Sequence, residues 1–141
     1  MDETALFYKL LPCHTLSDKP VSGKKLSKER LTVAFCMNAT GNDKLPPLVI
    51  NKSKRPRSFG KHFNPNTICA YYYNPKAWMN MIIFKDWLLK QNKRFKSRGR
   101  KILMLVDNAG GHNISLDLKV ELTHITLYYL PPNTTSEFRF I

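Results

Sequence analysis

The sequence lacks the cysteine spacing of a disulfide or zinc framework. Its three cysteines, Cys13, Cys36 and Cys69, are odd in number, far apart, and form no C-x-x-C pair. A disulfide scaffold or a zinc ribbon needs closely spaced pairs, so both are disfavoured and a reducing compartment is expected. Cys13 is followed by His14, but no second such pair accompanies it, and a metal role for this pair is therefore disfavoured.

Long apolar runs, internal repeats and low-complexity tracts are also absent. No segment has the length and apolarity of a membrane-spanning helix, and no signal peptide is visible, so a soluble chain without a membrane partner is expected. The 141 residues and the 43% hydrophobic content are enough for one domain with its own core. Residues 1–141 are therefore expected to form a single folding unit.

Acidic residues are scarce. The chain has 10 Asp and Glu against 23 Lys and Arg, a formal net charge of +13, and its basic residues cluster at 19–30, 52–61 and 90–101. Such a field favours polyanions, above all nucleic acid, although acidic lipids and acidic proteins would also be attracted. A basic surface that is merely well solvated is the alternative that charge alone leaves open.

Two short apolar runs predict a β-hairpin. Residues 31–37 read LTVAFCM, residues 38–42 contain turn-forming Asn and Gly, and residues 45–50 return as a second strand. Pro46 and Pro47 place that second strand at a sheet edge or delay its start, because proline cannot donate to a strand ladder.

A long helix is predicted after Asn74 and Pro75. Asparagine caps free amides and proline suits the first helical position, and Gly99 would end the helix after about Ser97. The stripe at helical spacing is interpreted as core rather than as a ligand box. Its members are Ala77, Met81, Phe84 and Leu88, widened by Trp78, Ile82 and Leu89.

Residues 101–106, KILMLV, predict a central strand buried on both faces, and residues 125–130, ITLYYL, predict another. Strands, a long helix and further strands favour an α/β domain, with helices packed on a mixed sheet.

Asp107 directly follows the first of these strands, at the end where catalytic groups of open α/β sheets lie. It is therefore a candidate metal-binding carboxylate, and a simple turn or helix-capping role is the alternative. Gly110 and Gly111 allow a sharp bend that returns His112 to the same rim, where the histidine is either structural or functional. Asp2 and Glu3 add two acids at the start, beside apolar residues 5–7, but spacing alone assigns them no role.

Several stretches together carry a family resemblance. They are residues 2–8 (DETALFY), 27–32 (SKERLT), 44–57, 77–79 (AWM), 105–108 with His112, and 130–136 (LPPNTTS). In combination they resemble the DDE superfamily endonuclease domain of pogo and Tigger-like transposases, relatives of centromere protein B. The resemblance covers nearly the whole chain.

The resemblance implies a ribonuclease H-like fold and Mg²⁺- or Mn²⁺-dependent cutting and joining of DNA by three acids. Asp2 occupies the position of the first acid and Asp107 that of the second, so both are the expected catalytic and metal-binding residues. The third acid normally follows the P-P-N-T-T-S motif, but Glu137 comes too early for it and the sequence stops at Ile141. Only Met1 precedes Asp2, where the family has a central strand, and we therefore expect a fold truncated at both ends.

These expectations lead to one hypothesis with two alternatives. The hypothesis is a transposase-derived, nucleic-acid-binding domain in the nucleus, catalytically impaired, with DNA held by Lys52, Lys54, Arg55 and Arg57. The alternatives are a non-catalytic basic binding module and a non-functional transposon relic. Self-association through an open sheet edge is also expected, because a missing strand would leave unpaired backbone groups.

Overall fold

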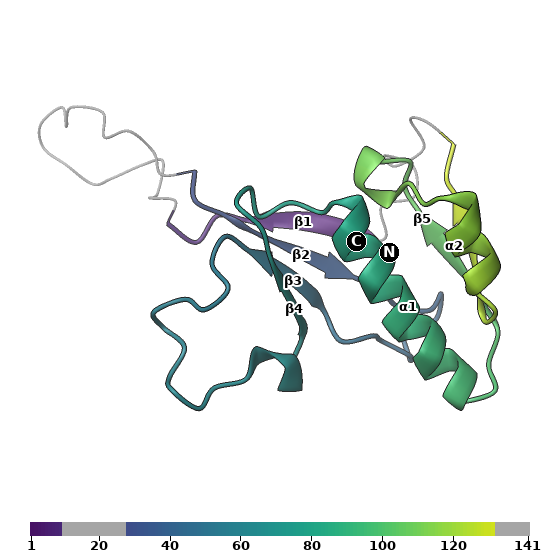
Figure 1. Cartoon of the computed structure of the whole chain (residues 1–141), viewed down its shortest axis with the longest axis horizontal. Coiled ribbons are helices and arrows are strands. Elements are labelled where there is room, and N and C mark those ends of the chain that lie inside the picture. Colours follow the sequence, from purple (N-terminus) through teal and green to yellow (C-terminus); the bar gives the residue numbers. More distant parts are fainter. Residues whose placement is uncertain (10–27, 132–141) are drawn as a thin grey trace, which may run out of the picture.

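The computed structural model describes residues 1–9 and 28–131, which form two sheets and their flanking helices (Figure 1). The four-stranded sheet has the order β1-β2-β3-β4 and the smaller sheet pairs β5 with β6. The strands are β1 (Asp2–Leu6), β2 (Leu31–Phe35), β3 (Leu48–Asn51), β4 (Ala70–Tyr73), β5 (Ile102–Val106) and β6 (Ile125–Tyr129). The helices are α1 (Met81–Ser97), α2 (Leu116–Glu121) and the 3₁₀ turns η1 (Pro65–Thr67) and η2 (Gly110–His112).

The predicted hairpin is confirmed, with a later second strand. β2 and β3 are antiparallel, and Val33 lies opposite Val49. β3 begins only after Pro47, so the two prolines delay the strand, and β3 is internal, between β2 and β4. Gly41, with a φ of 71°, lies in the connecting turn, where a left-handed backbone favours glycine.

The long helix ends where the sequence predicts but starts later. It begins at Met81, because the side chain of Asn80 accepts a hydrogen bond from the Ile83 N–H at 2.9 Å and caps the first turn. Asn74 closes a separate turn instead, and the positive φ of 52° at Ala77 interrupts any helix from there. At the other end, Gly99 has the left-handed φ of 61° expected of a helix stop.

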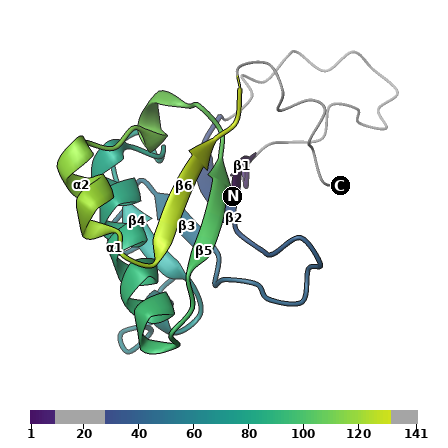
Figure 2. The ribbon, with the colours of Figure 1, turned by 90° about the vertical axis from the view of Figure 1, so that its right-hand side faces the viewer.

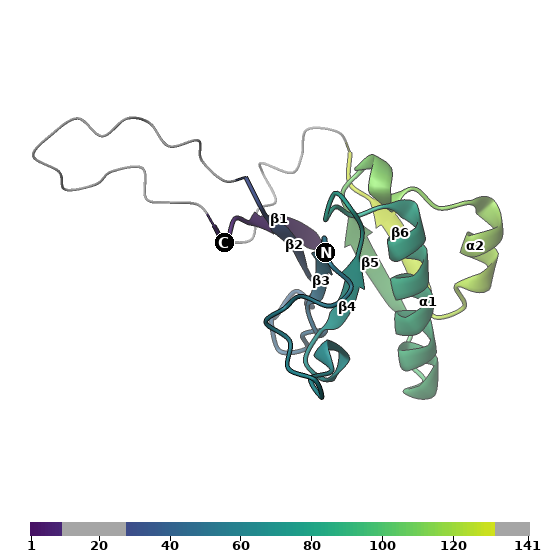
Figure 3. The same ribbon diagram turned by 60° about the vertical axis from the view of Figure 1, so that its left-hand side comes forward.

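The core lies between α1 and the two sheets, as Figures 2 and 3 show from two sides. Phe84 and Leu88 are fully buried, which confirms part of the predicted stripe. Trp78, Met81 and Ile82 are 55%, 57% and 79% exposed, so that part of the prediction is wrong. Because the helix starts later, the covered face is formed by the set Ile83, Phe84, Trp87, Leu88 and Phe95.

β5 and β6 are each covered on one face, not on both as the sequence predicted. In β6, Ile125 is buried whereas Tyr128 is 52% exposed. Met104 and Val106 are buried in the core, whereas Leu103 and Leu105 are 62% and 43% exposed. The reason is that the core containing α1 packs on one side of the strand, and alternate side chains point to opposite faces. The molecule is thus a mixed α/β structure whose sheets carry their helices on one side (Figure 2).

The C-terminal motif from Pro132 onward, including Glu137, lies outside the described residues, as do Cys13 and His14. Within the described part of the chain, no helix is both long and apolar enough to cross a membrane.

Candidate functional site

The first strand begins beside the end of β5. The amino group of Met1 donates to the Leu105 carbonyl at 2.8 Å, which joins the four-stranded sheet to the smaller one. Asp2 is the next residue along β1, and Asp107 follows the end of β5. Two segments far apart in sequence therefore meet at one edge, which we call the acid edge and define by Asp2, Glu3, Asp107 and His112. Asp2 and Glu3 are successive strand residues, so their side chains point to opposite faces, and Glu3 is the one that reaches His112.

His112 bridges two carboxylates at the acid edge. Its Nε2 lies 2.6 Å from Glu3 Oε1, and its Nδ1 makes a short contact with Asp107 Oδ1. The imidazole is only 2% exposed, whereas the Glu3 and Asp107 side chains are 24% and 33% exposed. The ring also packs on Phe84, with ring centroids 4.7 Å apart. The histidine therefore connects β1, the end of β5 and the core.

The two carboxylates favour the charged form of this histidine. Burial alone lowers the pKa of His112, but the hydrogen bond and charge of Glu3, together with Asp107, outweigh it and raise the pKa above 6.5. An imidazolium donates from both nitrogens, and ionised carboxylates only accept, so the protonated ring satisfies both neighbours. The acid edge thus favours a positive charge on the ring that lies between its two carboxylates.

A tight backbone contact holds His112 in place. η2 starts at Gly110, and a Cβ on Gly111 would lie 3.1 Å from the Met79 carbonyl oxygen. Tyr129 adds a hydrogen bond from its hydroxyl to the His112 carbonyl at 2.9 Å. The sequence predicted the bend at these glycines, and the structure adds the reason, which is close packing against the segment before α1.

The two predicted acids differ in their surroundings. Asp107 belongs to the His112 network, whereas Asp2 is exposed and its carboxylate accepts from the Glu3 N–H at 2.9 Å. Within residues 1–9 and 28–131, no hydrogen bond or ion pair joins Asp2 to Asp107. Glu3 was not predicted as a site residue, and its only signal in the sequence was that it adjoins Asp2.

The residue types at the acid edge suit a hard divalent cation in part. Mg²⁺ and Mn²⁺ prefer carboxylate oxygens and take further ligands from water and substrate phosphates. Asp2 is accessible, and the Asp107 contact to His112 is through Oδ1 only. Among the described residues, however, no group of three Asp, Glu, His or Cys side chains is arranged to hold a metal ion.

The predicted DNA-binding residues lie on an exposed segment between β3 and β4, which we call the basic loop (residues 52–63). Lys52, Lys54, Arg55 and Arg57 are all exposed. Arg55 Nη2 donates to the Gly60 carbonyl at 2.8 Å and also to that of Lys61, so this arginine folds the loop onto itself. The side chains of Lys52, Lys54 and Arg57 make no hydrogen bond or ion pair with the described part of the chain.

An aromatic cluster supports the basic loop. Phe59 packs edge-on against Phe63 and Tyr71, with ring centroids 4.9 and 5.5 Å apart. The Tyr71 hydroxyl donates to the Ser53 carbonyl at 2.6 Å. The lysines and arginines of the loop are therefore presented by a folded segment, which reduces the ordering entropy that a ligand must supply.

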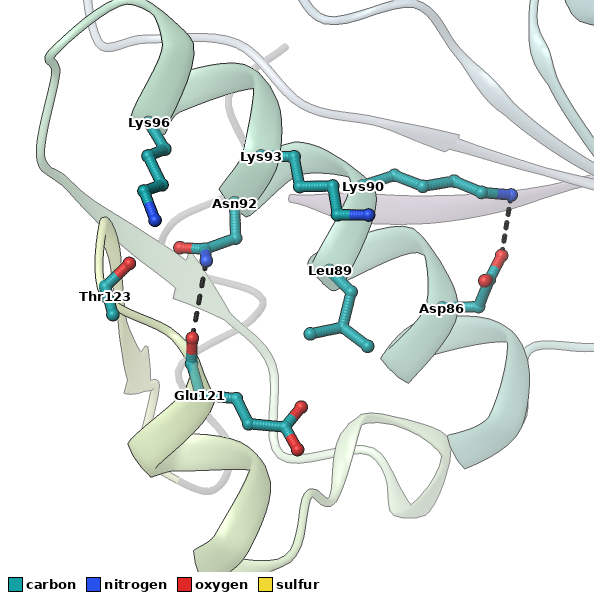
Figure 4. A pocket seen from close by; sticks show the side chains of 8 residues that line it. All are labelled: Asp86, Leu89, Lys90, Asn92, Lys93, Lys96, Glu121 and Thr123. Carbon is teal, nitrogen blue, oxygen red and sulfur yellow. Dashed lines mark hydrogen bonds and ion pairs between the residues drawn. The ribbon is translucent and has the colours of Figure 1, made fainter.

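A second basic surface lies in a groove of about 500 Å³ between α1 and the end of α2 (Figure 4). Lys90, Lys93 and Lys96 line it, and they belong to the predicted cluster at 90–101. Lys90 is ion-paired with Asp86 at 2.7 Å. Asn92 ties the walls together, donating to the Glu121 carbonyl and accepting from the His124 N–H.

Comparison with known proteins decides the family. Residues 28–140 match the family described as DDE superfamily endonuclease, a range that contains the basic loop, Asp107 and His112. The chain belongs to the DDE superfamily endonuclease family. Asp2 and Glu3 precede the matched range. The predicted resemblance is thereby confirmed.

The relatives of this DDE-family chain include proteins named for transposable elements and proteins named for the centromere. It is 34% identical over 139 residues to Tigger transposable element-derived protein 4 of Mus musculus and 35% over 141 residues to CENP-B homolog protein 2 of Schizosaccharomyces pombe, each match covering 96% of the chain. Major centromere autoantigen B of Homo sapiens is 33% identical over 133 residues, 94% of the chain. The chain spans 26%, 27% and 21% of these proteins. No solved structure is significantly similar to it.

Proposed function

We propose that this DDE-family chain is a nucleic-acid-binding domain that holds DNA through its basic loop. The observation that carries the proposal is a prefolded, exposed loop bearing Lys52, Lys54 and Arg57 on a chain of net charge +13. Positive side chains on a folded platform contact phosphates without reading bases. Binding is therefore expected to be electrostatic and nearly independent of sequence.

Two relatives support DNA as the partner. ARS-binding protein 1 of Schizosaccharomyces pombe, 34% identical over 114 residues, is named for binding ARS, and Major centromere autoantigen B is named for the centromere. The same names support a nuclear location for this chain. A fluorescent fusion of the full chain tests the location, and uniform cytoplasmic fluorescence would contradict it.

The direct test of binding uses two labelled DNA duplexes of equal length and unrelated sequence. Fluorescence anisotropy at increasing NaCl should give similar dissociation constants for both, and affinity should fall steeply with salt because counterions are released from the phosphates. Affinity that is insensitive to salt, or that differs strongly between the two sequences, would overturn the proposal.

We further propose that Asp2 and Asp107 retain a weak site for Mg²⁺ or Mn²⁺ and that strand cleavage is impaired. A bound ion would supply an activated water and stabilisation of the leaving oxygen. In this chain His112 contacts both Asp107 and Glu3 through its ring nitrogens, so an ion has to compete with the histidine for these carboxylates. The chain should show no detectable nicking of plasmid DNA in the presence of Mn²⁺. If nicking is observed and Asp107→Asn abolishes it, the proposed impairment is refuted.

The arrangement of strands supports a ribonuclease H-like fold and self-association as parts of the same proposal. Antiparallel β1, β2 and β3 lie beside the parallel pair β5 and β6, joined through Met1 and Leu105. The exposed Leu103 and Leu105 leave β5 with an apolar outer face. Light scattering after size exclusion should detect concentration-dependent dimers, and a monomer at every concentration would remove self-association from the proposal.

A further inference from the structure

Trp78 carries an arginine on its ring while more than half of the residue is open to solvent. The Arg30 guanidinium carbon lies 4.3 Å from the centroid of the Trp78 ring and 6.0 Å from that of Phe7. Trp78 is 55% exposed. Tryptophan is the aromatic residue that best binds a cation on its face. The guanidinium therefore lies over one face of the indole, and the exposed remainder of the ring is open to a ligand.

The backbone before Trp78 is strained and fixed. Ala77 has a φ of 52° and is fully buried, and its carbonyl accepts a hydrogen bond from Thr32 Oγ1 at 2.7 Å. The side chain of Asn74 bonds the N–H groups of Lys76 and Trp78 and the Trp78 carbonyl. A left-handed alanine is unfavourable, and such strain is commonly retained where a site needs it. The fold thus fixes the backbone that carries the exposed indole.

This exposed pair adjoins the acid edge. Met79 follows Trp78 directly, and its carbonyl packs against Gly111, the neighbour of His112. α1 contacts η2, and Figure 1 shows the start of the helix beside that turn. A nucleic-acid strand that reached this end of the fold would therefore pass close to Trp78.

We propose that Arg30 and Trp78 form a stacking platform for an unpaired nucleotide, with the base on the indole and the adjoining phosphate near the guanidinium. The platform rests on the proposed nucleic-acid binding and adds a preference for single-stranded or locally unpaired DNA. Stacking on aromatic side chains tolerates any base, because every base has a π face. The ordinary alternative, a surface contact that only supports the turn, would leave nucleic-acid affinity unchanged.

Tryptophan fluorescence reports on this platform selectively. The chain has two tryptophans, and Trp87 is 1% exposed with an indole N–H that meets no hydrogen-bond partner among residues 1–9 and 28–131, so Trp87→Phe removes the second emitter without breaking a described hydrogen bond. In that variant a single-stranded oligonucleotide should quench the Trp78 emission. An oligonucleotide of the same length with abasic sites throughout should bind more weakly and quench little.

Affinity for the single strand gives a second measurement in the otherwise unchanged chain. Trp78→Leu should weaken binding about 5- to 150-fold, since one stacked base contributes about 1 to 3 kcal/mol, and Trp78→Phe should retain most of the affinity. Ile82→Ala is the matched control, because Ile82 is 79% exposed four residues further along the chain and is apolar without being aromatic. Circular dichroism should show the same helix content in all variants.

The outcomes separate the platform from the proposed function. If binding is salt-dependent but Trp78→Leu leaves it unchanged, the stacking platform is overturned and nucleic-acid binding is not. Equal affinity for the abasic strand and the normal strand has the same meaning. Loss of affinity for Ile82→Ala as large as for Trp78→Leu would also overturn it, because it would indicate general apolar contact. A chain that binds neither duplex nor single strand refutes nucleic-acid binding itself.

Discussion

The acid edge and the basic loop use charge in opposite ways. At the acid edge, buried His112 satisfies Glu3 and Asp107 through both ring nitrogens. In the basic loop the charges are exposed, and of its four predicted DNA-binding residues Arg55 is the one that hydrogen-bonds within the segment. A buried histidine that bonds its neighbouring carboxylates stabilises the fold but competes with a metal ion for them. Exposed basic side chains contribute little to stability and much to phosphate binding. Changes at the acid edge should therefore affect unfolding, and changes in the loop should affect DNA affinity.

The largest effect is expected from His112→Ala. The substitution leaves Glu3 and Asp107 without their shared partner and opens a gap beside Phe84, which should lower the free energy of unfolding by about 2 to 4 kcal/mol. Urea unfolding followed by circular dichroism measures the loss. His62→Ala is the matched control, since His62 is exposed in the basic loop, and equal losses in both variants would contradict the bridging role.

Gly111→Ala should give the next largest effect. Its Cβ would meet the Met79 carbonyl oxygen at 3.1 Å, so η2 and the start of α1 must move apart, at a cost of about 1 to 2 kcal/mol. Gly110→Ala is the neighbouring control, because a Cβ there meets nothing within 4 Å. Thermal melts of the two variants compare them directly, and identical melting temperatures would show that the close approach is unimportant.

Within the basic loop, Arg55→Gln should destabilise and Arg57→Gln should not. Arg55 bonds the carbonyls of Gly60 and Lys61, and losing these contacts should cost about 0.5 to 1.5 kcal/mol of local stability. Arg57 makes no ion pair within the described residues. Limited proteolysis of the loop is the measurement, with faster cutting expected only for Arg55→Gln. Equal cutting of both variants would contradict the structural role of Arg55.

The smallest effect concerns Asp86 on α1. Burial opposes ionisation of its carboxyl, but hydrogen bonds from Lys90 and Tyr72 outweigh it and lower the pKa of Asp86. Because this pKa is lower in the folded protein, the ionised carboxyl stabilises the fold at pH values above its unfolded pKa of about 4. That contribution disappears as the pH falls through the folded pKa. Asp86→Asn should therefore cost a few tenths of a kcal/mol at pH 7, and less at pH 3. A cost that grows on acidification would reverse the assigned sign.

Local signals in the sequence predicted much of this fold. The β2–β3 hairpin, the end of α1 near Ser97 and Gly99, and the position of Asp107 after β5 all follow from turn residues and apolar periodicity. The predicted start of α1 was wrong because asparagine is a good helix cap at both Asn74 and Asn80. Burial of Ala77 against Thr32 decided between them, and no local signal encodes that contact.

The candidate site was harder to predict because its residues are distant in sequence. Glu3 and His112 are 109 positions apart, and their contact depends on β1 lying beside the end of β5. The exposed Trp78 was assigned to the core for a related reason, since helical spacing was extended across a segment that is not helical. The basic loop was recognised from composition, but the separate role of Arg55 required the folded loop.

The salt dependence of DNA binding in paired variants tests the central claim most directly. Lys54→Gln with Arg57→Gln should weaken binding to a labelled duplex and reduce the slope of log K against log NaCl by about 2, because each residue contributes roughly one phosphate contact. Lys93→Gln with Lys96→Gln removes the same charge from the groove on α1 and should change the slope less. An unchanged slope in the loop variant, or an equal change in both, would contradict the assignment of DNA binding to the basic loop.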